Sequence, residues 1–266
     1  MSFKSKVLAA AATLTMVGGV GTMGVLTAGT AGAATPSCGP ACINIFSRDF
    51  GTFKSPNFTL DVLRQGARVG QPNILFRVSN SDPALDWSLS FQGSVSDFCA
   101  AALVSALTCL HYGGAGHFNA VGGQCPTGTV GPDKNGVCTY PDLPAWEVEY
   151  APFGVDSGLC MGVAATASQG EGVSLQPCGV SGKTVWIGDT LDNPFSHYVP
   201  VINGSNTNFS HPFVLTYPNN SFPTDKPRPQ IQVRNLTGFT QPGGIFPVIT
   251  SVSSNQLWSA TFGVLR

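Results

Sequence analysis

The sequence predicts an all-β fold, and three observations support that prediction. Short apolar stretches with period-two alternation recur along the chain, as in residues 87–91 and 146–150. Turns rich in Gly, Pro and Asn separate them, in a chain with 32 Gly and 20 Pro. Only 10% of the residues are charged whereas 42% are hydrophobic, which favours a folded domain over a disordered chain.

The N-terminal stretch has the pattern of a secretory signal peptide. It contains Lys4 and Lys6, then an uncharged run over residues 7–26, then small residues at 31–33 that a signal peptidase accepts. The run could also span a membrane, but its Gly and Thr content and the cleavage pattern favour export. Removal of residues 1–33 predicts a secreted, extracellular protein of 233 residues without a membrane anchor.

All eight cysteines follow the predicted cleavage site, and an even number in an exported protein predicts disulfides. Their order suggests the local pairs Cys38–Cys42, Cys99–Cys109, Cys125–Cys138 and Cys160–Cys178. About a hundred connectivities are possible, and only the last pair has a structural argument, since its cysteines lie on two strands of one hairpin. Zinc is the alternative use, but no pair has Cys-x2-Cys spacing, so we expect no metal or cofactor.

The first half of the chain divides into a lead-in, several strands and an insertion. Residues 34–45 form a small Pro-rich lead-in closed by Cys38 and Cys42, and the apolar alternation begins within residues 43–46. Further strands are expected at residues 50–53, 58–62, 74–78 and 87–91. Residues 93–144 are expected to be an insertion stapled by its own disulfides, with one or two helical turns but no core of its own.

Strict alternation resumes after the insertion. Trp146, Val148 and Tyr150 are expected to face inward, and Glu147 and Glu149 outward into solvent. Later strands are expected at residues 159–163, 172–177, 185–187, 213–217, 230–234, 245–249 and 256–262. The polar segment 189–211 is expected to be a loop.

Three places share one order of strand, loop, strand, turn and tryptophan, ending at Trp87, Trp186 and Trp258. The middle one combines Cys160-x-x-Val163 with Val173-x-Leu175-x-x-Cys178, the last one ends Asn255-Gln-Leu-Trp258, and the first contains Leu60-Asp61-Val62. These motifs resemble the ricin B-type β-trefoil lectin family over residues 46–92 and 146–266. The resemblance implies a single β-trefoil-like domain, residues 46–266, with three pseudo-repeats and the insertion at 93–144.

The spacing of the tryptophans requires two long inserted segments. They lie 99 and 72 residues apart, whereas a compact unit of such a family has about forty residues. The insertion at 93–144 and the polar segment 189–211 are expected to account for the excess.

The resemblance also implies sugar-binding positions, namely an Asp, an amide, an aromatic ring and the Asn-Gln pair before the tryptophan. Hydroxyls need a carboxylate and amides, and the apolar face of a sugar stacks on a ring. No unit is complete: Ala84 and Leu85 replace Asn-Gln in the first, and Thr216 and Arg234 replace the Asp and the ring in the third. The middle unit lacks these residue types and is expected to be structural. The candidate carbohydrate-binding residues are Asp61, Asn73, Phe76, Gln232, Asn255 and Gln256.

Loss of Lys4 and Lys6 leaves 11 basic and 14 acidic residues, and this net charge of −3 argues against a nucleic-acid partner. The preferred interpretation is a monomeric, non-enzymatic lectin-like protein with degenerate sugar sites, whose partner is a glycan or cell-wall polysaccharide. A secreted glycoside hydrolase or other exported hydrolase is one alternative, because Glu147 and Glu149 lie about 7 Å apart along one strand. A trefoil-based interaction or inhibitor protein is the other. We identify no catalytic residues, since no histidine has triad or metal-ligand spacing.

Overall fold

The computed structural model describes residues 43–52, 55–78, 87–114, 117–125, 131–180, 182–189, 197–237 and 252–262. The predicted signal peptide, the Cys38–Cys42 pair and the strand expected at 245–249 lie outside these ranges. Within them, no helix is both long enough and apolar enough to cross a membrane.

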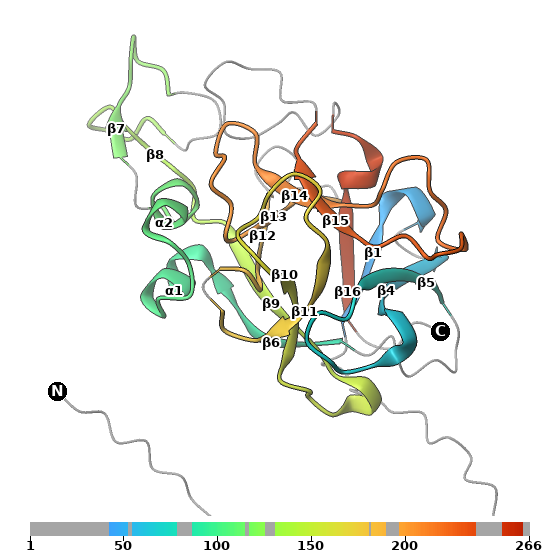
Figure 1. The fold of residues 1–266 in the computed structure, drawn as a ribbon. Coiled ribbons are helices and arrows are strands. Elements are labelled where there is room, and N and C mark those ends of the chain that lie inside the picture. The colour runs from blue at the N-terminus through green and yellow to red at the C-terminus, as the bar shows by residue number, and fades with distance from the viewer. Residues whose placement is uncertain are drawn as a thin grey trace, which may run out of the picture. The chain divides into compact units, whose positions relative to one another are not determined.

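Six strands of the described chain form a closed antiparallel barrel (Figure 1). Pairing runs continuously in the order β16, β1, β6, β9, β12 and β13. A bridge between Val199 and Trp258 joins the residues before β13 to β16 and closes the ring. The strands are β1 (Ile43–Ser47), β6 (Trp87–Ser94), β9 (Pro144–Tyr150), β12 (Val185–Gly188), β13 (Val201–Asn203) and β16 (Trp258–Phe262).

Three hairpins in the described ranges meet one another beside the barrel. They are β4 (Phe58–Val62) with β5 (Asn73–Arg77), β10 (Leu159–Val163) with β11 (Val173–Pro177), and β14 (Phe213–Thr216) with β15 (Gln232–Asn235). Isolated bridges join each hairpin to the other two: Pro72 to Ser174, Gly172 to Gln232 and Ile74 to Gln230. A six-stranded barrel with a triplet of hairpins is a β-trefoil, so the predicted fold class is confirmed.

Each trefoil unit supplies four strands: β1, β4, β5 and β6 in unit one, β9 to β12 in unit two, and β13 to β16 in unit three. The same hydrogen bond ends every unit, in which a buried indole N–H donates to a carbonyl in the first strand of the hairpin. Trp87 donates to Leu60 (3.2 Å), Trp186 to Met161 (2.9 Å) and Trp258 to Leu215 (2.7 Å). The three tryptophans therefore occupy pseudo-equivalent positions, as predicted.

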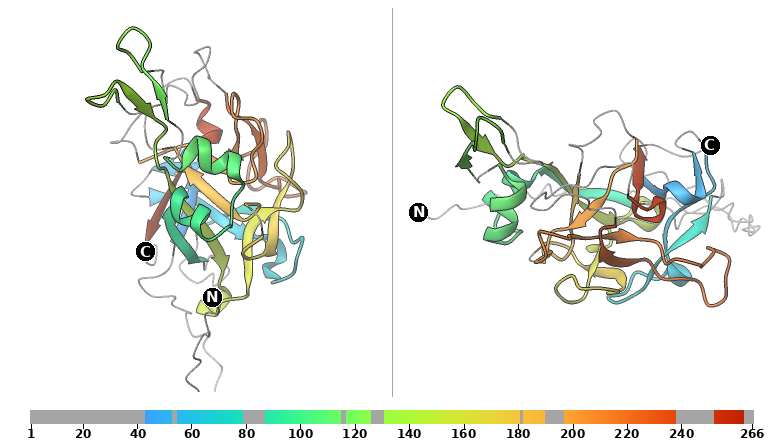
Figure 2. Two further views of the ribbon diagram at one scale, coloured as in Figure 1. Left: turned by 90° about the vertical axis from the view of Figure 1, so that its left-hand side faces the viewer. Right: turned by 90° about the horizontal axis from the view of Figure 1, so that it is seen from above.

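The insertion between β6 and β9 runs from residue 95 to residue 143, because those strands stay paired as far as Ser94 and Pro144. It contains α1 (Val95–Ala100), α2 (Ala106–Tyr112), β7 (His117–Asn119) and β8 (Val137–Thr139). Figure 2 shows the β7–β8 hairpin projecting beyond the two helices. Disulfides Cys99–Cys109 and Cys125–Cys138 are present as predicted.

Residues of the insertion belong to an apolar core that they share with the barrel. Val95, Phe98 and Tyr112 are fully buried, and they belong to a second apolar cluster that includes Ile187 and Ile202 of the barrel strands. The two short helices each present an apolar side to the outer surface of the barrel. A few large side chains on one face of a short helix are enough for this packing.

Two further boundaries differ from the prediction. The segment 189–211 is not wholly a loop, since it contains β13, where Asn203 is fully buried and its side-chain amide donates to the Lys183 carbonyl at 3.0 Å. Strand β1 begins at Ile43, which pairs with Phe262 of β16, so it includes the last residues of the segment expected to be the lead-in. The remaining short elements are β2 (Gly51–Thr52), β3 (Ser55–Pro56) and the 3-10 turns η2 (Arg48–Phe50), η3 (Leu63–Gln65), η5 (Pro152–Gly154) and η7 (Ser254–Gln256).

Candidate functional site

The repeated tryptophan hydrogen bond sets the alignment of the three units, residue by residue. The position after each accepting carbonyl, where the sequence motif has its carboxylate, is Asp61, Gly162 and Thr216. The strand pairing then places opposite them Ile74, Ser174 and Gln232. Two residues further along the second strand lie Phe76, Gln176 and Arg234. Only unit one has both a carboxylate and an aromatic ring at these positions.

In unit one, Asp61 and Phe76 line the same cavity, which has a volume of about 180 Å³ and which we call the Asp61 cavity. The Asp61 side chain is only 2% exposed, and its Oδ1 accepts a hydrogen bond from the Val62 amide at 2.6 Å. Arg64 and Arg228 also line the cavity, and the Arg228 guanidinium lies over the Phe76 ring, 4.4 Å from its centroid. A carboxylate, a ring and two guanidinium groups therefore meet at one place.

Asn73, a predicted sugar contact, lies on the other face of β5. It is fully buried and does not line the Asp61 cavity. The residue that pairs with Asp61 across the hairpin is Ile74. The prediction put Asn73 at the position near Asp61, but in the hairpin the neighbouring residue Ile74 occupies that position. Since side chains alternate between the faces of a strand, an error of one residue moves the group to the opposite side.

The corresponding place in unit two is closed by the backbone. A Cβ atom at Gly162 would lie 2.9 Å from the Lys183 carbonyl oxygen, so no larger side chain fits. Gln176 is buried and donates to the Ser174 hydroxyl at 2.9 Å. No carboxylate side chain therefore fits at this position of unit two.

In unit three, the predicted sugar contacts form hydrogen bonds with other groups of the protein. Gln256 is 2% exposed, and its Nε2 donates to the Thr216 hydroxyl (3.1 Å) and to the Asn235 carbonyl (2.9 Å). Asn255 Nδ2 donates to the Tyr217 carbonyl at 2.7 Å. Gln232 Oε1 accepts from Arg234 Nε at 3.0 Å. These amides are engaged within the protein, and none of the three residues lines the Asp61 cavity.

The prediction that Glu147 and Glu149 are solvated acids was wrong. Their side chains are 3% and 8% exposed, because the ends of the β10–β11 hairpin cover this face of β9. Glu147 accepts hydrogen bonds from the Gly179 amide (2.6 Å) and the Thr184 hydroxyl, and Glu149 accepts from the Gly158 amide (2.6 Å). Burial raises the pKa of Glu149 above its usual value. Both carboxylates thus satisfy backbone donors at the hairpin ends.

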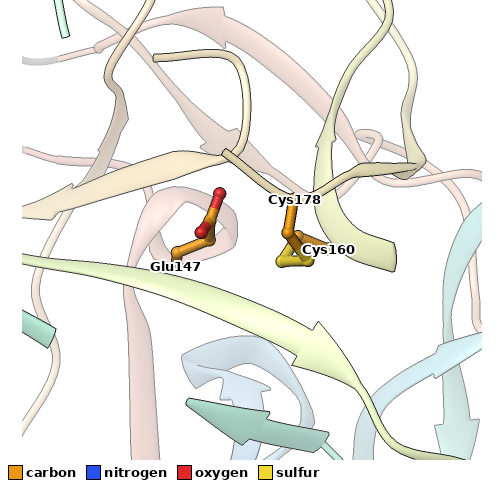
Figure 3. A group of neighbouring side chains, drawn as sticks. All are labelled: Glu147, Cys160 and Cys178. Atoms are coloured by element: carbon orange, nitrogen blue, oxygen red, sulfur yellow. A yellow bond between two sulfur atoms is a disulfide. The ribbon is translucent and has the colours of Figure 1, made fainter. Parts of the chain in front are cut away.

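Glu147 also lies next to a disulfide (Figure 3). One of its carboxylate oxygens and the sulfur atoms of Cys160 and Cys178 lie within 4.8 Å of one another, a set of donor types that can bind a metal. The two sulfurs are bonded to each other as predicted, so neither is a free thiolate. This cluster joins the two strands of the unit-two hairpin to β9 and serves the fold.

A larger cavity, about 370 Å³, lies among residues of the barrel strands. Its lining is apolar, with Trp146, Trp186 and Trp258 among its walls, apart from His197 and Ser259. It has no carboxylate or amide side chain that could bind sugar hydroxyls. The Asp61 cavity is therefore the better of the two candidates for a polar ligand. This chain is a β-trefoil protein with a polar cavity in unit one.

Comparison with known proteins gives structural neighbours only. Neither a scan of protein-family profiles nor a search of curated proteins gives a match. The chain is similar to the designed three-fold symmetric protein ThreeFoil, with 13% identity, a TM-score of 0.44 and coverage of 83% of this chain and 98% of that one. A mosquitocidal holotoxin matches at 9% identity and a TM-score of 0.40, covering 83% of this chain and 17% of the toxin. An agglutinin from Abrus precatorius matches at 12% identity and a TM-score of 0.26, covering 88% and 100%. The fold assignment itself rests on the strand pairing described above.

Proposed function

We propose that this chain is a secreted, lectin-like β-trefoil protein of the ricin B type that binds a glycan at the Asp61 cavity. The observation that carries the proposal is the meeting of Asp61 and Phe76 in one cavity, while Gly162 and Thr216 hold the equivalent position in the other units. A carboxylate accepts hydrogen bonds from sugar hydroxyls, and an aromatic ring offers a surface for the apolar face of the sugar.

The leader-like N-terminus supports the secreted part of this proposal. Three disulfides, Cys99–Cys109, Cys125–Cys138 and Cys160–Cys178, are of a kind that forms and persists in oxidising compartments. Detection of the mature protein in the culture medium of the producing cell, starting near residue 34, would support export. Retention of an intact N-terminus on cellular protein would contradict it.

A glycan array followed by calorimetric titration tests the binding. Asp61→Asn keeps an oxygen that can accept from the Val62 amide but removes the charge, so we expect affinity for the best glycan to fall about tenfold or more. Glu171→Gln, which removes one charge from the hairpin loop of unit two, is the matched control and should bind like the wild type. If no glycan, neutral or acidic, binds the wild-type protein, the proposed function fails and the trefoil as a frame for protein interactions becomes the better interpretation.

The hydrolase alternative has less support from the geometry. Glu147 and Glu149 are buried and accept hydrogen bonds from hairpin groups, whereas an inverting pair needs room for a water and a sugar between its carboxyl groups. Incubation of any bound glycan with the protein, analysed for new reducing ends, tests this point. Release of sugar that is lost in Glu147→Gln would reinstate the alternative.

A further inference from the structure

We propose that the Asp61 cavity recognises an acidic sugar, a hexuronate whose carboxylate is bound by Arg64 and Arg228. This inference rests on the proposed function and specifies the class of its ligand. It follows from the cations around the cavity, from the group that covers Phe76 and from the backbone at Arg64.

Cationic side chains gather at the hairpin of unit one although the chain as a whole has a net charge of −1. A second cavity, about 450 Å³, shares Leu63 and Arg64 with the Asp61 cavity and adds Arg68 and Gln71 to the lining. Arg64 and Arg68 are exposed to solvent. Three guanidinium groups therefore line the two adjoining cavities, and Asp61 is the one carboxylate in their lining.

The second observation concerns Phe76, the ring on which a sugar is expected to stack. The guanidinium of Arg228 lies over that ring at 4.4 Å, and Nη1 of Arg228 donates to the Pro223 carbonyl at 2.8 Å. On the face that Arg228 covers, a neutral sugar would have to displace this cation to stack on the ring. A carboxylated sugar gains from it instead, because a guanidinium binds a carboxylate through two parallel hydrogen bonds while remaining stacked on an aromatic face.

The third observation is the backbone of Arg64, with φ 60° and ψ 20°. This left-handed conformation favours glycine, yet the chain has an arginine there, at the edge of both cavities. Residues other than glycine with this backbone conformation are concentrated at functional sites such as ligand sites. The conformation also supplies a useful variant, because Arg64→Gly suits the backbone while it removes the cation.

The chemistry of a hexuronate matches the site group by group. Asp61 can accept from ring hydroxyls, while Arg64 and Arg228 hold the carboxylate. A neutral hexose satisfies the first contact but has no partner for the guanidinium groups. Discrimination would therefore depend on the ligand's charge, and it would weaken as salt screens it.

The test compares oligogalacturonate with its methyl ester, which has the same sugar ring without the charge, by isothermal titration. We expect the acid to bind about tenfold or more tightly than the ester, and added salt to reduce that difference. Arg64→Gly and Arg228→Gln should each remove most of the preference. Lys134→Gln, on the distant β7–β8 hairpin, is the charge-matched control and should retain it. A thermal melt of each variant checks that the fold is intact.

The outcomes separate this inference from the proposed function. If neutral glycans or the ester bind as tightly as the acid, the acidic-sugar inference is overturned while the lectin-like function stands. If a sulfated hexose binds with the same affinity as the uronate, the site binds anions in general, and the claim that it selects a carboxylate is contradicted. If neither neutral nor acidic glycans bind, both proposals fail together.

Discussion

Replacing Asn73 with valine is expected to stabilise this protein, although asparagine is the natural residue. The Asn73 side chain is fully buried, and among the described residues neither its amide nitrogen nor its amide oxygen has a hydrogen-bond partner. By strand register, the equivalent positions of units two and three are held by the apolar residues Val173 and Ile231. Unit one thus has a polar side chain where pseudo-symmetry calls for an apolar one.

The size of the effect follows from the two amide atoms. An unsatisfied buried polar group costs roughly 1–3 kcal/mol, and valine removes both while filling a similar volume in a strand. The main-chain hydrogen bond from the Ile231 amide to the Asn73 carbonyl, at 2.9 Å, does not depend on the side chain and is retained. For a domain of this length, a gain of about 1–3 kcal/mol corresponds to a rise in Tm of roughly 2–12 °C.

Urea and thermal denaturation of Asn73→Val measure the change. Asn203→Val is the matched control, since Asn203 is equally buried but its amide donates to the Lys183 carbonyl (3.0 Å) and accepts from the Ser205 amide (3.0 Å). The same substitution there should lower stability by about 1–3 kcal/mol, because it leaves those groups without partners. If Asn73→Val lowers Tm as Asn203→Val does, the reasoning is refuted and the Asn73 amide has a stabilising partner.

Three other predictions concern the shared architecture. Trp186→Phe removes the indole N–H that donates to the Met161 carbonyl, and it removes part of the barrel core. We expect the free energy of unfolding to fall by about 2–4 kcal/mol. A loss under about 1 kcal/mol would show that this hydrogen bond is dispensable. Replacing both Cys160 and Cys178 with alanine opens a crosslink of sequence separation 18 and should cost about 3 kcal/mol, measured by urea denaturation against the wild type. Burial raises the pKa of Glu149 in the folded protein above its value of 4.5 in the unfolded chain. The wild type should therefore lose stability as the pH rises from 4.5 through the folded-state pKa. Glu149→Gln should lack that decline. The difference between the two urea midpoints across this pH range tests the claim, with Glu171→Gln as control, and parallel curves would contradict it.

Several predictions from the sequence were right because each depends on local rules. Cys160 lies on β10 and Cys178 directly follows β11, so pairing of this hairpin brings them together without reference to the rest of the chain. The tryptophans at 87, 186 and 258 were placed by a repeated order of strands and turns, and the structure gives each the same indole hydrogen bond. Alternation likewise gave the inward direction of Val148 and Tyr150, which are buried in the core.

The candidate site was less predictable, because it depends on register and on what covers each face. Asn73 and Ile74 differ by one position, and only the pairing of β4 with β5 decides which of them faces Asp61. Arg228 lies more than 150 residues along the chain from Phe76, so no local pattern indicates that its guanidinium covers the ring. Arg228 lies between β14 and β15, outside the strands whose pattern defines the repeated units.

The sequence by itself determined that this chain is an all-β protein of three repeated units, because alternation, turn residues and the repeated order of strands, turns and tryptophan depend on residues that are close along the chain. Tertiary structure alone decided which acids face a cavity. Glu147 and Glu149 alternate like solvated residues, yet the β10–β11 hairpin covers them, whereas Asp61 lines a cavity that Arg64 and Arg228 share. The physical reason is that burial and local charge are set by groups distant in sequence, which only the closed barrel and its hairpin triplet bring together.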